Sequence, residues 1–260
     1  MISQVLSYFK FITKSNNEHG VHSPFIFNLV TQCLYTKTDR DNKFKHDKYR
    51  RSLLENKKII EVTDFGKGSK VFKSNKRQIS KIAKVAGISK IKSNLLLRLV
   101  QYFKPSNILE IGTSLGIGTA ALSIPDSNSK ITTLEGCPET HKIAKNTLSK
   151  FELKNIEFIT GDFQETLPNV IENNVYDLIY FDGNHQKKPT LDYFNQCLKS
   201  IHNDSVFIFD DIHWSKEMEE AWELIKKHDK VTVTIDIYFW GIVFFRKEQV
   251  KEHFKIRVFR

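Results

Sequence analysis

The chain has 260 residues, of which 40% are hydrophobic and 27% charged, and its formal net charge is +10. This length fits one large domain, or a domain with an extension, and the hydrophobic share excludes global disorder. No apolar run approaches the ~20 residues of a membrane span, and the first residues, MISQVLSYFKFITKS, lack the order of a signal peptide. We therefore expect a cytoplasmic protein without a membrane partner. The 3 cysteines form no CxxC pair and indicate neither a disulfide framework nor a zinc site.

The charge is unevenly distributed along the chain. Residues 1–104 carry 22 Lys/Arg and 7 Asp/Glu, a balance of +15, whereas residues 105–260 carry 18 and 23, a balance of −5. Such asymmetry can indicate a nucleic-acid or acidic-substrate face. The lysines are scattered through the basic segment, however, and this favours a solvated surface.

Residues 1–104 are predicted to form a mainly helical, basic extension or lid. Helical patterns occupy ISQVLSYFKFI, SPFIFNLVTQCLY, KYRRSLLEN and ISKIAKVAG…SNLLLRLVQYF, with polar interruptions near 36–47 and at 63–70. His19 and His22 flank a glycine, which favours a structural turn over the core, with a substrate lid as the alternative. The segment TDFGKGSK, residues 63–70, resembles a mobile lid loop.

From residue 105 onward, predicted strands alternate with predicted helices. We expect strands at 107–112, 130–136, 156–162, 177–182 and 205–211, and helices at 118–124, 139–151, 190–201 and 215–228. This alternation implies right-handed βαβ units and a mainly parallel sheet. Two final β-rich runs, KVTVTIDIYF and WGIVFFRK, indicate an antiparallel hairpin, although Trp240-Gly241 could equally be a bulge. The predicted fold class is α/β, with a Rossmann-like, seven-stranded, mostly parallel sheet over 105–260.

The first candidate site is the turn LEIGTSLGIG, residues 109–118. Its glycines allow a sharp turn and a close approach of a ligand, and the following helix offers free N–H groups. The spacing differs from the dinucleotide motif GxGxxG, and no lysine follows as in a phosphate loop. Glu110, inside the preceding strand, would repel a pyrophosphate and suits a ligand with a cationic end.

Two further acids follow at the ends of predicted strands. Glu135 comes 19 residues after Gly116, close to the ~20 expected for an acid that binds ribose hydroxyls; an exposed loop acid is the alternative. Asp162 ends the third strand, on the adenine side of such a pocket, or it is a turn residue that binds its own backbone.

In this order and spacing, these features resemble class I S-adenosylmethionine-dependent methyltransferases over residues 105–260. Within that class the likeness is to the catechol-type and bacterial small-molecule O-methyltransferases. The resemblance implies S-adenosylmethionine as the cofactor. It also implies that Glu135 binds the ribose and that Asp162 lies near the adenine. The methionine portion would be held by Glu110 and the turn residues Gly112, Ser114, Gly116 and Gly118.

The second candidate site combines YFDGNH, residues 180–185, with IFDD, residues 208–211. Each ends a predicted strand with an Asp, so Asp182 and Asp210 should lie close together, beside the cofactor's methyl group. Such a cluster needs a proton or a cation, and oxygen ligands suit a hard divalent ion. In catechol-type enzymes Asp, Asp and Asn hold magnesium or calcium. The resemblance therefore places Mg²⁺ or another divalent cation at Asp182, Asp210 and Asp211, where Asp211 replaces the family's Asn.

The predicted catalytic residues are Asp182 and His185. Catechol-type enzymes have a lysine three residues after the first metal-binding Asp, and here that position is His185. A histidine can take a hydroxyl proton near neutral pH or ligate a metal, and His213 is the rival for either role. The predicted acceptor is the hydroxyl of a small molecule. An RNA acceptor, bound through the basic segment, is the alternative, although no stacking motif is present. A non-catalytic scaffold on the same fold and a homodimer are left open.

Overall fold

The computed structural model describes residues 2–63 and 74–258, with the side chains of residues 2–6 excepted. The predicted lid loop at 63–70 therefore lies outside the described residues apart from Thr63. The chain divides into two compact units. We call Lys37–Val170 the central unit, and Met1–Thr36 with Ile171–Arg260 the terminal unit. The predicted division of roles at residue 104 stays a prediction.

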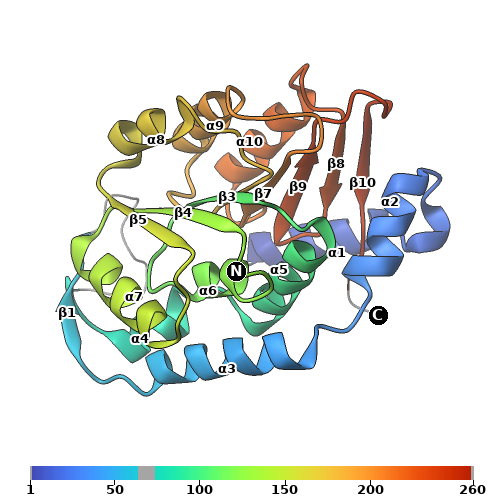
Figure 1. Cartoon of the computed structure of the whole chain (residues 1–260). Helices are drawn as coiled ribbons and strands as arrows, with labels where there is room; N and C mark the ends of the chain where they lie inside the picture. Colours follow the sequence, from blue (N-terminus) through green and yellow to red (C-terminus); the bar gives the residue numbers. More distant parts are fainter. Residues whose placement is uncertain (1, 64–73, 259–260) are drawn as a thin grey trace. The chain divides into compact units, whose positions relative to one another are not determined.

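The central unit contributes three adjacent parallel strands, with helices packed on them (Figure 1). Glu110 lies opposite Thr133 in their register, and Glu135 lies opposite Thr160. A short antiparallel pair, β1 with β2, is separate from these strands. The strands are β1 (Ile59–Glu61), β2 (Lys76–Gln78), β3 (Asn107–Ile111), β4 (Lys130–Glu135) and β5 (Ile156–Thr160). The helices are α3 (Arg40–Leu54), α4 (Ile79–Val85), α5 (Lys90–Phe103), α6 (Ile117–Ser123), α7 (Pro138–Lys150) and α8 (Phe163–Ile171), which ends where the terminal unit begins.

Helix α3 corrects one expectation. It begins at Arg40, because the side chain of Asp39 accepts a hydrogen bond from the N–H of Asn42 at 2.9 Å and so caps the helix. The predicted polar interruption near 36–47 is therefore wrong for residues 40–47. The buried face of α3 includes His46 and Tyr49, one turn apart.

The terminal unit contains five strands in the order β6-β7-β9-β8-β10. β6 and β7 are parallel, and β9 is antiparallel to both β7 and β8, as the predicted hairpin requires. The strands are β6 (Leu178–Phe181), β7 (Val206–Asp210), β8 (Val233–Asp236), β9 (Trp240–Phe244) and β10 (Glu252–Lys255). The helical segments are α1 (Ile2–Lys14), η1 (Glu18–Gly20), α2 (Pro24–Leu29), η2 (Val30–Leu34), α9 (Lys187–Cys197) and α10 (Lys216–Lys227).

Strands β3–β10 give an α/β architecture of mostly parallel strands with C-terminal antiparallel strands, so the predicted fold class is confirmed. The part of the chain that the structure describes has eight such strands, one more than predicted. The added strand, β10, pairs in parallel with β8. Its backbone also bonds to the N-terminal segment, where the N–H of Asn16 donates to the carbonyl of Lys255 at 2.7 Å.

Aromatic packing and one glycine fix the core of the terminal unit. Phe181 and Phe209 are partners across β6 and β7, and their rings stack with centroids 4.2 Å apart. Gly241 of β9 faces Trp222 of α10 so closely that a Cβ there would lie 2.5 Å from the indole ring. Residue 241 must therefore be glycine for α10 to pack on the sheet. Gly241 pairs regularly within β9, so it is not a bulge.

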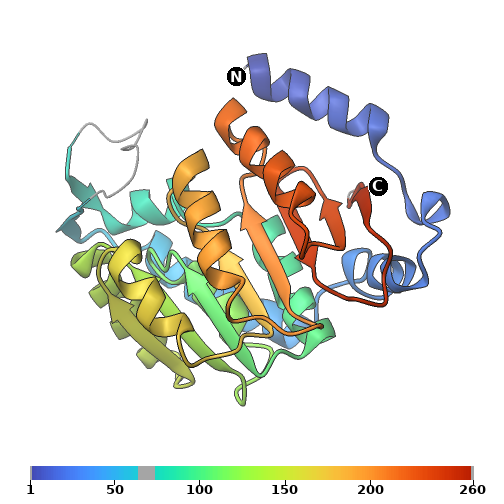
Figure 2. The same ribbon diagram turned by 90° about the horizontal axis from the view of Figure 1, so that it is seen from above.

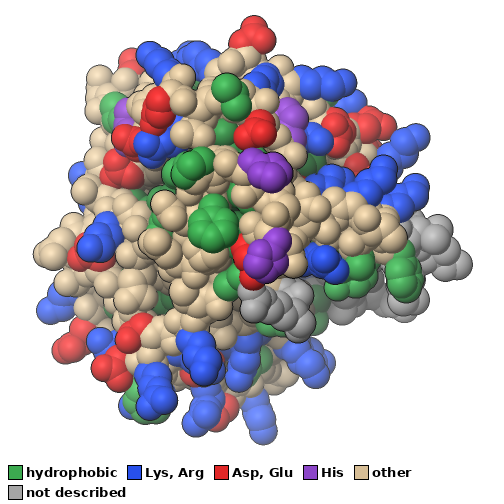
Figure 3. All heavy atoms as spheres, turned by 90° about the vertical axis from the view of Figure 1, so that its right-hand side faces the viewer, with side chains coloured by type: hydrophobic (Ala, Val, Ile, Leu, Met, Phe, Trp, Pro, Cys, Tyr) green, Lys and Arg blue, Asp and Glu red, His purple; other side chains and the backbone are tan. Residues whose placement is uncertain are grey.

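The remaining sequence features lie on the surface. His19 belongs to the short turn η1, where its N–H donates to the side chain of Asn17, and its own side chain is 83% exposed. His22 is also exposed. Lys and Arg side chains are spread among acidic ones on the face drawn in Figure 3. No helix among the described residues has both the length and the apolar character that a membrane crossing requires.

Candidate functional site

The glycine turn follows β3 in the central unit, as predicted. Gly116, with φ +77°, is the N-cap of α6. A Cβ at this position would lie 2.7 Å from Tyr49 Oη and 2.9 Å from a methyl carbon of Leu148. Both the left-handed backbone and the close approach therefore require glycine here. Ser114, at φ +47°, is a second left-handed residue in the same turn.

Glu135 ties the end of β4 to this turn. One carboxylate oxygen accepts a hydrogen bond from the N–H of Ser114 at 2.7 Å, and the other accepts one from the N–H of Cys137 at 2.9 Å. Burial raises the pKa of Glu135, and these backbone hydrogen bonds oppose the rise. The acid predicted to bind ribose is thus held beside the glycine turn by main-chain donors.

Glu110 is entirely buried between strand and helix. Its Oε2 accepts hydrogen bonds from Thr119 Oγ1 at 2.5 Å and Thr133 Oγ1 at 2.6 Å. Its Oε1 is buried and has no hydrogen-bond partner among the described residues. Burial raises the pKa of Glu110 to about 7, although the two threonine hydroxyls oppose the rise. A cationic group of a ligand would have to meet this carboxyl at Oε1.

Asp162 lies just beyond β5, at the same edge of the sheet. The neighbouring Gly161 N–H bonds to the carbonyl of Glu135 at 3.0 Å. Asp162 Oδ1 accepts a hydrogen bond from the N–H of Gln164 at 2.8 Å and so supports the start of α8, a helix that the sequence pattern did not indicate. The adenine role of Asp162 stays a prediction.

Two buried residues of α3, which the sequence did not indicate, form hydrogen bonds with backbone carbonyls of the glycine turn. Tyr49 Oη donates to the carbonyl of Leu115 at 2.7 Å, and His46 Nε2 donates to the carbonyl of Ile117 at 2.9 Å. Burial raises the pKa of Tyr49 well above its ordinary value and lowers that of His46, so both are neutral donors. Their spacing on one helix face predicts burial, but nothing in the sequence connects them to a turn some 66 residues away.

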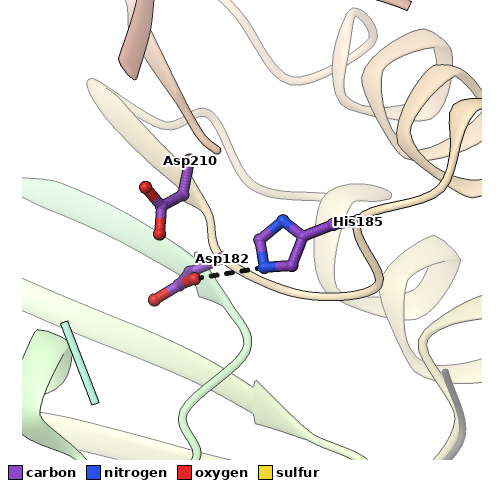
Figure 4. Close-up of side chains that lie close together, drawn as sticks. All are labelled: Asp182, His185 and Asp210. Atoms are coloured by element: carbon purple, nitrogen blue, oxygen red, sulfur yellow. Dashed lines mark ion pairs between the residues drawn. The ribbon is translucent and has the colours of Figure 1, made fainter. Parts of the chain in front are cut away.

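The terminal unit brings together Asp182, His185 and Asp210, as Figure 4 shows. One ligand atom from each lies within 4.8 Å of the others, and His185 Nε2 is 3.7 Å from Asp182 Oδ1. Asp182 follows β6 and Asp210 ends β7, so the parallel pairing of these strands aligns the two acids. Tyr180 Oη donates to Asp182 Oδ2 at 3.3 Å. Side chains two residues apart in a strand lie on the same face, so the sequence could have indicated the contact between Tyr180 and Asp182.

Asp211, the third predicted metal ligand, is not part of this group. It has a left-handed backbone, with φ +54°, and its N–H donates both to Asp210 Oδ1 and to the carbonyl of Phe239, each at 2.9 Å. Its main chain therefore orients Asp210. The metal-ligand role of its side chain stays a prediction.

His213 bridges two carboxylates elsewhere in the terminal unit. Its Nδ1 lies 3.0 Å from Glu219 Oε1 and its Nε2 lies 3.0 Å from Asp236 Oδ2. Burial works against the charged ring, but the hydrogen bonds and charges of Asp236 and Glu219 outweigh it and raise the pKa of His213. Both ring nitrogens of His213 are thus engaged by carboxylates, and its role as a base stays a prediction.

The donor set at Asp182, His185 and Asp210 fits a divalent cation. Two carboxylates and an imidazole offer oxygen and nitrogen ligands, and converging carboxylates need a cation or a proton to offset their repulsion. His185 and Asp210 also line a cavity of about 10 Å³, close to the volume that one water molecule requires.

Comparison with known proteins agrees with this architecture. Residues 109–212 match a family described as a methyltransferase domain. The chain is 40% identical over 89 residues to the protein-L-isoaspartate O-methyltransferase of Methanococcus vannielii, covering 34% of this chain and 41% of that protein. It is 27% identical over 130 residues to the catechol O-methyltransferase of Niastella koreensis, covering 48% and 58%. The chain thus spans less than two thirds of either relative.

Solved structures extend the likeness to the fold. An O-methyltransferase from Bacillus cereus in complex with SAH aligns with a TM-score of 0.53 and 24% identity, covering 62% of this chain and 83% of that one. The SAH-bound Podospora anserina methyltransferase PaMTH1 aligns with a TM-score of 0.60 and 14% identity, covering 87% and 97%. The resemblance to methyltransferases is confirmed for residues 109–212, which match the methyltransferase domain, and the chain shares the fold of these solved methyltransferases.

Proposed function

We propose that this protein is an S-adenosylmethionine-dependent O-methyltransferase whose acceptor is a hydroxyl of a small molecule. The observation that carries the proposal is the convergence of Asp182, His185 and Asp210, an acid–base group within a methyltransferase fold. The matched methyltransferase domain and the O-methyltransferases among its structural relatives support it.

The central unit would bind the cofactor. Glu135, which two main-chain donors hold beside the glycine turn, would accept hydrogen bonds from the ribose hydroxyls of a nucleoside. The neutral or weakly acidic Glu110 would meet the cationic amino group of the methionine portion at Oε1 and would ionise on doing so. SAH in the structures of B. cereus and P. anserina relatives supports this choice of cofactor.

The transfer itself is a displacement at carbon. The acceptor oxygen forms a bond to the sulfonium methyl, the carbon–sulfur bond breaks with its electron pair going to sulfur, and the hydroxyl proton goes to His185 Nε2. Asp182 Oδ1, 3.7 Å from that nitrogen, stabilises the resulting imidazolium. Alignment of acceptor and methyl supplies much of the rate enhancement in such reactions.

The divalent cation of the resemblance would be held by Asp182, His185 and Asp210. When bound there, it would lower the pKa of an acceptor hydroxyl. His185 Nε2 cannot bind a cation and accept a proton at once. A metal-dependent enzyme would therefore use His185 as a ligand, and a metal-independent one would use it as the base.

The test uses a matched pair of histidine variants, His185→Gln and His213→Gln. Methyl transfer to a panel of catechols and other hydroxyl compounds is followed from radiolabelled S-adenosylmethionine, with and without prior chelation. We expect His185→Gln to lower kcat by about 1,000-fold with cofactor affinity unchanged, and His213→Gln to keep most of the activity. Full activity of His185→Gln would overturn the assignment of the base.

The same panel separates the alternatives. The isoaspartate relatives favour inclusion of an isoaspartyl peptide, whose acceptor oxygen belongs to a carboxylate. Transfer to that peptide alone would replace the hydroxyl acceptor. An RNA acceptor, the alternative suggested by the +15 segment, would require RNA binding that weakens steeply with salt.

A further inference from the structure

A cavity of about 510 Å³ lies between α1 and α10 of the terminal unit. The two helices run alongside each other in Figure 2. Ser7 Oγ donates to Glu219 Oε1 at 2.7 Å, and the ring of Tyr8 packs edge-on against Tyr238 with centroids 4.9 Å apart. The first helix is therefore fixed beside α10, and the cavity between them is a built feature of this unit.

The walls of this cavity are charged. The lysines that line it are Lys10, Lys14, Lys187, Lys216 and Lys255, and the acids are Glu219, Glu220 and Glu223. Each acid has a cationic group within ion-pair distance. Glu219 pairs with His213 at 3.0 Å, which it shares with Asp236, while Glu220 pairs with Lys187 at 2.8 Å and Glu223 with Lys226 at 2.7 Å. Five lysines against three acids leave the wall of the cavity with an excess of positive charge.

Three of the lysines, Lys10, Lys14 and Lys216, lie on the two helices that flank the cavity. The charge of Lys10 acts on Glu219 and that of Lys216 on Glu220, but both acids have a nearer cationic partner in His213 and Lys187. All three are exposed at the cavity between the helices. Three ammonium groups around one hollow create a positive potential that attracts anions.

The floor of the cavity is apolar. Phe11 and Trp222 are 4% and 2% exposed, and Leu224 adds an exposed aliphatic side chain. An apolar floor with cationic walls suits a molecule that has an apolar body and anionic substituents.

The cavity and the candidate acid–base group are built on the same elements of the terminal unit. β7 ends at Asp210 and β8 ends at Asp236; both strands run antiparallel to β9, so these ends share one edge of the sheet. His213 bonds to Asp236 and lines the cavity. Met218 of α10 lines the small cavity beside His185 and Asp210.

We propose that the cavity between α1 and α10 binds a small molecule that carries a phosphate or carboxylate group on an apolar body, with the anionic group held by Lys10, Lys14 and Lys216. Under the proposed function, this molecule is the methyl acceptor, and that identification rests on the proposed function. The proposal that the cavity binds such a molecule does not depend on the proposed function.

The experiment measures binding of phenyl phosphate, benzoate and phenol to the full chain by calorimetry. We compare the wild type with the triple variant Lys10→Gln, Lys14→Gln, Lys216→Gln. The matched control is Lys199→Gln, Lys227→Gln, Lys247→Gln, which removes the same charge from exposed lysines of the same unit outside the cavity. Thermal unfolding followed by circular dichroism verifies that both variants fold, as substitutions of exposed lysines should allow.

We expect phenyl phosphate to bind more tightly than benzoate, and phenol to bind weakest. The cavity variant should weaken phenyl phosphate binding by about 10-fold, because three partly exposed charge contacts are lost, and the control should leave it unchanged. Equal binding of phenyl phosphate and phenol, or equal loss in both variants, would overturn the site. Equal affinity of benzoate and phenyl phosphate would contradict the expected preference for phosphate and would show that the cavity binds both anionic groups alike.

A second measurement separates this site from the proposed function. S-adenosylmethionine binding should be the same in the cavity variant, the control and the wild type. Competitive inhibition of methyl transfer by phenyl phosphate would support the acceptor assignment. Binding of phenyl phosphate without such inhibition would overturn that assignment while the anion site stands. A chain that binds phenyl phosphate but no S-adenosylmethionine would overturn the proposed function alone.

Discussion

The carboxylates of the two units differ in what surrounds them. In the central unit, Glu110 accepts hydrogen bonds from two threonine hydroxyls, and Glu135 accepts two from backbone N–H groups. In the terminal unit, Asp182 and Asp210 converge on each other and on His185. In the central unit, the acids are held by hydrogen bonds from threonine hydroxyls and backbone N–H groups of the protein. The arrangement in the terminal unit leaves a concentration of negative charge that a proton, a cation or a reacting group can offset.

This difference indicates a division of labour. Acids that are held by fixed donors suit the recognition of a ligand, whereas acids that converge suit a step in which a proton is transferred. Substitutions in the two units should therefore separate affinity from turnover.

The largest expected effect is on turnover, in the terminal unit. Asp210→Asn removes one charge from the converging group, so the imidazolium or cation at His185 is less stabilised. We expect kcat to fall by about 1,000-fold, within the range for lost acid–base groups, with S-adenosylmethionine affinity nearly unchanged. Steady-state kinetics and calorimetry give the two quantities.

Asp211→Asn is the matched control for that variant. It makes the same chemical change one residue later, outside the group, and asparagine tolerates the left-handed backbone at this position. We expect kcat within about threefold of the wild type, because the main-chain bond to Asp210 is retained. Equal losses in the two variants would contradict the separation of Asp211 from the catalytic group.

The next largest effect is on affinity, in the central unit. Glu135→Ala removes the acceptor for Ser114 and Cys137 and the expected partner of the ribose. We expect S-adenosylmethionine to bind about 100-fold more weakly, since hydrogen bonds to charged groups contribute roughly 1.5–3 kcal/mol each. Calorimetry measures the change. Glu157→Ala, at an exposed acid of β5, should bind as the wild type does, and unchanged affinity in Glu135→Ala would exclude this residue from the cofactor site.

A third effect concerns pH and the buried acid. The pKa of Glu110 is raised by burial from 4.5 to about 7, so the folded state binds its proton more tightly than the unfolded state does. Its contribution to stability is complete below pH 4.5 and is lost as the pH rises through 7. The free energy of unfolding of the wild type, relative to Glu110→Gln, should fall by about 2 kcal/mol between pH 5 and 7. Urea unfolding at several pH values measures this difference, and a constant difference would show that the carboxyl does not titrate there.

The sequence predicted what depends on chain order. The strand ends at Glu135, Asp182 and Asp210 follow from short apolar runs that stop at an acid, and parallel pairing then brings such ends to one edge. The start of α3 was missed because its first residues are polar, and a capping Asp decides where it begins.

What the sequence could not predict depends on contacts between distant segments. The two carboxylate partners of His213, the rival to His185 as the base, include one that lies 23 residues away in the chain. The hydrogen bond from Tyr49 to Leu115 in the glycine turn likewise joins residues 66 positions apart. No periodicity reports such a contact, because it arises only when the helix packs on the sheet.

The smallest expected effect tests that last contact. Tyr49→Phe keeps the ring, which packs edge-on against Phe151 at 5.3 Å, and removes only the hydroxyl that donates to the carbonyl of Leu115. The buried carbonyl then loses its donor, which should cost about 1 kcal/mol of stability. Because the turn is also less firmly held, S-adenosylmethionine should bind about fivefold more weakly while kcat at saturation stays unchanged. Tyr8→Phe, at a 43% exposed tyrosine, controls for loss of a hydroxyl as such. If Tyr49→Phe lowered stability without lowering cofactor affinity, the hydroxyl would support only the fold, and the geometry of the turn would be set by Gly116 and Glu135 alone.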